Sequence, residues 1–193
     1  MPALALLAVS LLAAGTADAG PPKPPFAWVV PAGWRTETIP FPLDFAPEVK
    51  HRGLEELRFP PGMFKPDAPD FWSYAFVWWL EGETALSAEA LERELTDYFR
   101  GLSAVVGKKY SFESSRFKCR LKAGEGAITG TIDTYDAFKT GKPITLHVRI
   151  TSKTCGQHTA VQAAFSPKEP SAPIWSDLLD LLATFACPRA DPK

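Results

Sequence analysis

The hydrophobic positions of this chain follow two patterns, a near-continuous apolar run and recurrences at helical spacing. The run Ser73–Leu80 (SYAFVWWL) is apolar at almost every position and is followed by Glu81 and Gly82. Its length of about eight residues and its aromatic content favour a strand. Neighbouring side chains on a strand point to opposite faces, so this strand needs cover on both sides. The two faces would carry Tyr74, Phe76 and Trp78 on one side and Ala75, Val77 and Trp79 on the other.

Two other segments place apolar residues on one face of a helix. The segment LSAEALERELTDYFRGL predicts a helix over about 87–103, with Ser87 as its N-cap. A second helix is expected over about 173–186, because Pro173 suits a first helical turn and Pro188 limits any continuation. The apolar stripes are Leu91, Leu95, Phe99 and Leu102 in the first helix, and Ile174, Trp175, Leu178, Leu182 and Phe185 in the second.

The remaining strand-like segments surround these elements. Short strands are expected at Glu37–Phe41 and Glu55–Phe59, within a proline-rich region that forbids long helices. After Arg116 the segments FKCRL, GAITGTIDTY, PITLHVRIT and HTAVQAAF are separated by short linkers that contain glycine. Such spacing predicts an antiparallel meander. The chain is therefore expected to be an α+β domain, with a mainly antiparallel sheet and two packing helices.

In layout the chain resembles the PsbP/Mog1-type α/β fold. The features that carry the resemblance are PAGW near the start, the strand-to-helix step WWLEGETALSAEALERELTDYF, the late meander and the closing helix WSDLLDLLATF. The resemblance covers most of residues 26–187, and the proline-rich insert at residues 40–70 departs from it. It implies a fold rather than an activity. The members that we associate with this fold are mostly non-enzymatic accessory or binding proteins.

The N-terminus predicts export. An apolar run from Ala3 to Ala14 precedes Ala17-Asp18-Ala19, the pattern of a secretory signal peptide cut before Gly20. We therefore expect a signal peptide at residues 1–19, a proline-rich entry segment at 20–27 and one α+β domain at 28–188. The run is too short for a comfortable membrane span, so no transmembrane segment is expected after cleavage. A secreted or periplasmic protein is predicted.

Charge and motifs narrow the possible functions. The 193 residues carry a formal net charge of -1, which gives no reason to expect nucleic acid as a partner. The sequence contains no Walker loop, dinucleotide fingerprint, H-E-x-x-H or G-x-S-x-G. No cofactor, metal or catalytic residue is therefore assigned from motifs.

The three cysteines, Cys119, Cys155 and Cys187, have no metal-binding spacing. In an exported chain they favour one disulfide and one leftover thiol. The strand after Cys155 would carry the chain roughly 26 Å away, and the closing helix would bring it back by roughly 20 Å. This geometry favours a Cys155–Cys187 disulfide and leaves Cys119 as a buried, small apolar residue.

Polar residues of the meander form one candidate site. If the hairpins are tight, Asp133, His147, Arg149 and Gln162 share one sheet face, with Gln162 near His147. A carboxylate beside an imidazole is the minimal acid/base unit, but the sequence indicates no nucleophile. An ordinary solvated face of a half-covered sheet explains the same pattern.

Aromatic residues form the second candidate site. Trp34 and Trp72 lie in loops and are expected to be the most exposed tryptophans, where they could stack on a sugar or another flat ligand. Our interpretation of the sequence is an exported, non-enzymatic binding or accessory domain for an unidentified protein or small ligand. The alternatives are a carbohydrate or small-ligand module that uses Trp34 and Trp72, and a small hydrolase that uses His147 and Asp133.

Overall fold

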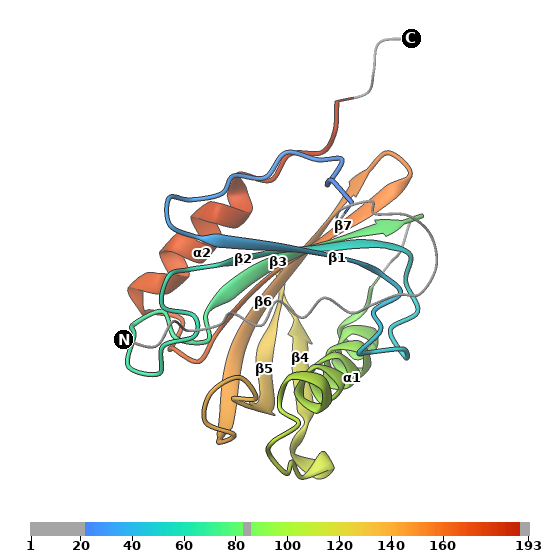
Figure 1. Ribbon diagram of the computed structural model, residues 1–193. Helices are drawn as coiled ribbons and strands as arrows, with labels where there is room; N and C mark the ends of the chain where they lie inside the picture. Colours follow the sequence, from blue (N-terminus) through green and yellow to red (C-terminus); the bar gives the residue numbers. More distant parts are fainter. Residues whose placement is uncertain (1–21, 83–85, 190–193) are drawn as a thin grey trace.

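The computed structural model describes residues 22–82 and 86–189, so the predicted signal peptide lies outside the described residues. Within them the chain forms one antiparallel sheet in the order β1-β2-β3-β7-β6-β5-β4, with two α-helices (Figure 1). The expected α+β class with a mainly antiparallel sheet is confirmed. The elements are β1 (Arg35–Phe41), β2 (Gly53–Phe59), β3 (Tyr74–Glu81), α1 (Ala88–Val106), the 3₁₀ turn η1 (Ser114–Arg116), β4 (Lys118–Ala123), β5 (Ile128–Tyr135), β6 (Pro143–Cys155), β7 (His158–Ser166) and α2 (Pro173–Ala183).

The helices begin where the sequence predicts but end differently. The Ser87 side chain caps α1 by accepting a hydrogen bond from the Ala90 N–H at 3.2 Å, and α1 continues three residues past the expected end. Pro173 occupies the first turn of α2, which ends at Ala183 rather than at residue 186. The chain after α2 instead forms an isolated bridge between Ala186 and Ala27. None of the helices within the described residues is both long and apolar enough to cross a bilayer.

Strand β3 lies at the centre of the sheet, between β2 and β7, and is buried on both faces. Trp78 is fully buried and Trp79 is 4% exposed. Alternate side chains of β3 enter two separate hydrophobic cores, as the sequence predicts. The α1-side core receives Tyr74, Phe76, Trp78 and Leu80, and the α2-side core receives Ala75, Val77 and Trp79.

The two helices cover opposite faces and different halves of the sheet (Figure 1). Helix α1 packs against β4 and β5, while α2 packs against β7 and β3 on the other face. Proline-rich loops complete the α1-side core through Leu43, Val49 and Met63, each at most 2% exposed. The N-terminal segment completes the α2-side core through Phe26 and Trp28. The apolar strand β3 is therefore covered on both faces by other elements of the same chain.

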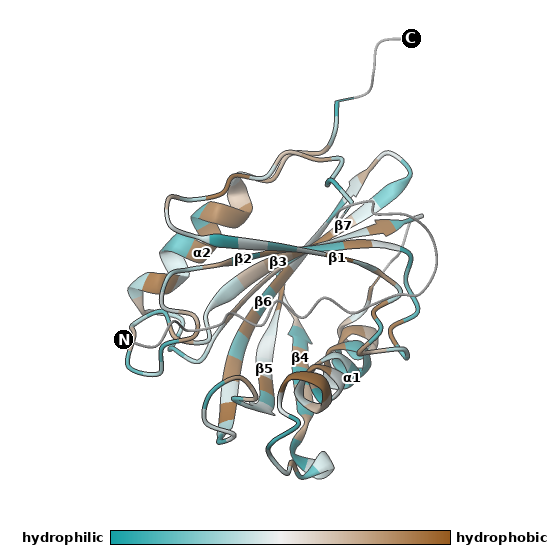
Figure 2. Cartoon of the chain, viewed as in Figure 1, coloured by the Kyte–Doolittle hydropathy of each residue, from teal (hydrophilic) through white to brown (hydrophobic). Residues whose placement is uncertain are grey.

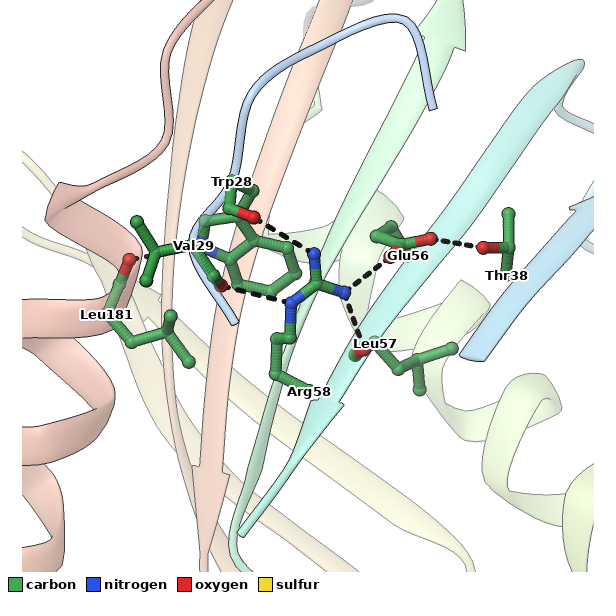
Figure 3. Close-up of polar contacts among 7 residues, drawn as sticks. All are labelled: Trp28, Val29, Thr38, Glu56, Leu57, Arg58 and Leu181. Carbon is green, nitrogen blue, oxygen red and sulfur yellow. Dashed lines mark hydrogen bonds and ion pairs between the residues drawn. The ribbon is translucent and has the colours of Figure 1, made fainter. Parts of the chain in front are cut away.

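A buried arginine on β2 holds the N-terminal segment in place (Figure 3). The Arg58 guanidinium donates to the backbone carbonyls of Trp28 and Val29 at 3.2 and 3.1 Å and stacks over the Trp28 ring at 4.4 Å. It also forms a buried ion pair with Glu56, whose other carboxylate oxygen accepts from Thr38. The Trp28 indole N–H donates to the Leu181 carbonyl of α2 at 3.0 Å. One side chain therefore joins β2, the N-terminal segment and, through Trp28, helix α2.

The predicted disulfide is present between Cys155, at the end of β6, and Cys187, after α2. Their Cα atoms are 5.4 Å apart. Cys119 is a free, buried cysteine, as expected. Burial and the neighbouring Glu92 carboxylate raise the pKa of its thiol to about 12, so this thiol stays protonated and unreactive at neutral pH.

Replacing Arg58 tests the anchoring of the N-terminal segment. We expect Arg58→Ala to lower the free energy of unfolding by about 3 kcal/mol or more, because Glu56 would remain buried without its cation. The measurement is urea denaturation followed by tryptophan fluorescence. Arg100→Ala is the matched control, because Arg100 pairs with Asp97 on the surface of α1 and should cost less than about 1 kcal/mol. Equal losses in the two variants would contradict the anchoring role.

Candidate functional site

Within residues 22–82 and 86–189, no helix packs over the face of β4, β5 and β6 on the α2 side of the sheet. The side chains of this face alternate with buried ones such as Cys119, Ile132 and Leu146, which enter the α1-side core. The change between hydrophilic and hydrophobic residues along these strands is visible in Figure 2. We call this surface the open face. It consists of Lys118, Arg120 and Lys122 from β4, Thr129, Thr131 and Asp133 from β5, and Thr145, His147, Arg149, Thr151 and Lys153 from β6.

The open face is basic. It carries five Lys and Arg side chains and one histidine, against the single carboxylate of Asp133. The surrounding sequence has the same bias, since residues 107–189 hold 12 Lys and Arg against seven Asp and Glu. The net charge of the whole chain is near zero, but the charges are unevenly distributed and the surface of β4–β6 is positive.

The carboxylate of Asp133 is bound to neighbours other than His147. It accepts from Arg120 at 2.7 Å and from the Thr145 hydroxyl at 2.7 Å. Burial raises the pKa of Asp133, but these two hydrogen bonds, together with the charges of Arg120 and Arg116, outweigh it and lower the pKa below its ordinary value. The Asp133 side chain is consequently an anion at neutral pH and a poor proton acceptor.

His147 lies on the predicted face, but its neighbour on β7 differs from the one expected. It pairs with Thr131 on β5 and Ser166 on β7, and its Nε2 lies 3.6 Å from the Glu169 carboxylate. The prediction that Gln162 lies near His147 is wrong, because Gln162 pairs with Thr151. The reason is the length of β6, which continues through residues 152–155 and shifts the expected register by four residues. Asp133, His147, Arg149 and Gln162 do point to the same side of the sheet.

The turn that sets this register contains only two residues, Gly156 and Gln157. Gly156 has a φ of +63°, a backbone conformation that suits the first position of a two-residue hairpin loop and that other residues rarely adopt. The stretch SKTC, which looks like a linker in the sequence, is therefore the end of a strand.

A hollow of about 260 Å³ lies where the open face meets α2. Its sheet side presents Arg149, Thr151 and Gln162, which are all half-buried. Within residues 22–82 and 86–189, none of these three side chains has a hydrogen-bond or ion-pair partner. Its helix side presents Leu179, Leu182 and Ala183, and Leu179 is 37% exposed. The hollow thus combines unpaired polar groups with an apolar wall.

The predicted aromatic platform does not form. Trp72 is 1% exposed, so the expectation of an exposed Trp72 is wrong. Its indole N–H donates to the buried Asp136 carboxylate at 2.8 Å, and its ring packs on Phe138 at 5.3 Å between centroids. Trp34 is half-buried against the α2-side core, whereas Trp72 lies in the α1-side core. The two indoles therefore lie on opposite sides of the sheet.

A buried carboxyl group on β2 was not singled out from the sequence. Glu55 is fully buried in the sheet on the side of Trp78, whose indole N–H donates to it at 3.0 Å. Tyr98 of α1 hydrogen-bonds it as well, and its Oε2 atom has no partner among the described residues. Burial is the main cause that raises the pKa of Glu55 to about 8, so the group is mostly neutral at pH 7.

Comparisons with known proteins assign no family to this chain. No protein-family model matches its sequence, and no curated protein matches it either. Within the described residues, no group of three or more His, Cys, Asp and Glu side chains could hold a metal ion. The candidate site therefore consists of the open face and the hollow beside α2.

Glu55 should make stability depend on pH. The folded pKa of about 8 lies above the ordinary value of 4.5, so between these pH values the folded state binds one more proton than the unfolded state. The stabilisation is complete below about pH 4.5 and is lost as the pH rises through 8. In urea denaturation between pH 5 and pH 8, the wild type should lose roughly 3–4 kcal/mol more than Glu55→Gln does.

The matched control for this measurement is Glu48→Gln, which changes an exposed carboxyl group in the same half of the chain. It should follow the pH dependence of the wild type. Parallel curves for the wild type and Glu55→Gln would show that Glu55 does not carry the extra proton.

Proposed function

We propose that this chain is an exported, non-enzymatic binding domain that holds an anionic partner on its open face. The observation that carries the proposal is the excess of cationic side chains on a sheet face that neither helix nor the N-terminal segment covers. Lys118, Lys122 and Lys153 are exposed there, within reach of an incoming molecule. Complementary charge of this kind speeds association and selects partners by sign.

A polar face alone would be ordinary, because antiparallel sheets often have one solvated side. Two features favour binding over simple solvation. The face is biased to one sign, whereas a solvated surface usually mixes both signs. Among the described residues the half-buried Arg149 also has no acceptor, although Arg58, Arg100 and Arg120 each pair with a carboxylate. An arginine that is partly withdrawn from water and unpaired is suited to an external anion.

The hydrolase alternative has less support. A dyad would need Asp133 to orient His147, but Asp133 is bound to Arg120 and Thr145. Its low pKa also removes it as a general base near neutral pH. A sugar site built on Trp34 and Trp72 has no support from the packing of these residues, because Trp72 is buried.

Two further features are consistent with an exported binding domain. The N-terminal sequence has the pattern of a secretory signal peptide, and a disulfide such as Cys155–Cys187 persists in oxidising compartments outside the cytosol. The layout of strands and helices resembles the PsbP/Mog1-type fold, whose members we associate mostly with accessory or binding roles. Under this proposal the protein is secreted or periplasmic.

Charge reversal on β4 tests the proposed function. We expect fluorescein-labelled poly-L-glutamate to bind the wild-type protein at 20 mM salt, as measured by fluorescence anisotropy. The double variant Lys118→Glu/Lys122→Glu should bind at least about tenfold more weakly, a difference of about 1.4 kcal/mol, because it replaces two positive charges on the open face with two negative ones. Raising the salt to 150 mM should weaken the binding by the wild type.

The control is Lys108→Glu/Lys109→Glu, which makes the same change in net charge between α1 and η1, away from the open face. It should change the affinity by less than about threefold. If both double variants weaken binding equally, the interaction is non-specific. If the wild type does not bind, the open face is not an anion-binding surface.

A further inference from the structure

The hollow between α2 and the open face differs from the rest of this surface in having two unlike walls. Arg149, Thr151 and Gln162 offer hydrogen-bonding groups from β6 and β7, and Leu179, Leu182 and Ala183 offer methyl and methylene groups from α2. We propose that this hollow binds a carboxylate that carries a short apolar chain. The inference rests on the proposed function, because it names the class of anion that one part of the open face would select.

The polar wall fits a carboxylate. The guanidinium of Arg149 is planar and carries five N–H donors, which match the two oxygens of a carboxylate in a bidentate arrangement. Thr151 and Gln162 lie opposite each other in the β6–β7 register, and each can donate a further hydrogen bond. Because none of the three has a partner within the described part of the chain, a ligand would not displace an existing interaction.

The apolar wall explains why the anion should carry a chain. The buried stripe of α2 is centred on Leu178, and Leu179 lies about 100° round the helix, on the same flank as Ala183. Leu179 is 37% exposed, so the described residues leave this apolar flank of the helix partly uncovered. A bound alkyl chain would remove this surface from water, next to the largely buried Leu182.

The carboxylates of α2 do not already satisfy Arg149. Asp177 lies about 100° round the helix from Leu178 in the opposite direction, on the flank away from the hollow. Asp180 points outward and accepts a hydrogen bond from Ser176 at 3.4 Å. None of the six residues that line the hollow is acidic.

The size of the hollow limits the ligand. A volume of about 260 Å³ lies just under the range of about 300–1,000 Å³ that is typical of small-molecule sites. A carboxylate with four to eight carbon atoms is therefore a better match than a long-chain lipid. Each methylene group that becomes buried should raise the affinity about fourfold.

The test uses three probes and isothermal titration calorimetry on the purified protein. Sodium octanoate supplies both features, sodium acetate supplies the carboxylate alone and 1-octanol supplies the chain alone. We expect octanoate to bind at least tenfold more tightly than either acetate or 1-octanol. Equal affinities for octanoate and acetate, or for octanoate and 1-octanol, would overturn the two-walled site.

Two variants locate the site, each with a control that makes a similar change elsewhere. Arg149→Gln should weaken octanoate binding at least tenfold, whereas Arg100→Gln on the surface of α1 should change it by less than twofold. Leu179→Ser should weaken it about fivefold or more, whereas Val30→Ser, at another exposed apolar residue, should change it by less than twofold. Octanoate binding that survives Arg149→Gln would overturn the assignment.

The poly-L-glutamate measurement separates this inference from the proposed function. If poly-L-glutamate binds the wild type and octanoate does not, the open face binds anions but the hollow does not select a carboxylate with an apolar chain. If neither binds, both proposals fail. Circular dichroism of Arg149→Gln and Leu179→Ser should match that of the wild type, since both side chains lie at the surface of a framework that they do not support.

Discussion

The fold depends on the burial of β3 from both sides. A strand with Phe76 and Trp78 on one face and Val77 and Trp79 on the other cannot leave either face in water, because each large aromatic side chain would expose an extended apolar surface. An antiparallel sheet with one solvated side is therefore not available at its centre. Helix α1 and the proline-rich loops cover one side, while α2 and the N-terminal segment cover the other. The open face is the area that this arrangement leaves over, because α2 packs mainly on β7 and β3 and only borders β6 at the hollow.

Glu55 and Glu56 are neighbours on β2, but they point to opposite sides of the sheet and differ in whether they have a cationic partner. Glu55 points into the α1-side core, where it meets the indole of Trp78 and the hydroxyl of Tyr98 but no cation. Desolvation therefore raises its pKa and favours the neutral carboxyl group. Glu56 points to the other side and forms an ion pair with Arg58. The Glu56–Arg58 ion pair also anchors the N-terminal segment. This segment covers β3 on the α2 side, so a polar interaction helps to bury an apolar strand.

The sequence predicts the parts of this structure that depend on local patterns. The period of the apolar residues gave β3, both helices and the meander, and Ser87 and Pro173 marked the helix starts correctly. The Cys155–Cys187 disulfide followed from the lengths of one strand and one helix. The register of β6 and β7 did not follow, because SKTC has few apolar residues and resembles a loop. In the structure, the chain turns within two residues at Gly156, which adopts a conformation that favours glycine. The SKTC residues therefore pair with β7.

Exposure was harder to predict than secondary structure, for a physical reason. Trp72 precedes β3 and has a φ of +52°, which is uncommon for a residue other than glycine. This conformation is held by its backbone hydrogen bond to Met63 at 3.0 Å and by the bond between its indole and Asp136. Met63 lies earlier in the same loop and Asp136 lies in another loop, and the local sequence around Trp72 does not indicate these contacts. The position of Trp72 in a loop therefore led to the wrong expectation that it is exposed. Lys118 and Lys122, by contrast, alternate with Cys119 and could have been placed on the face of Asp133 from the strand period alone.

The position of α2 explains why the hollow lies at its edge. The stripe of α2 includes Ile174, Leu178 and Leu182, which are buried, while Leu179 is 37% exposed and borders the hollow. The strand next to β7 is β6, which turns Arg149 and Thr151 toward this exposed flank. The fold leaves the apolar flank of Leu179 next to Arg149, whose side chain has no partner among the described residues. This pairing of an apolar and a cationic surface is the reason for proposing an amphipathic ligand.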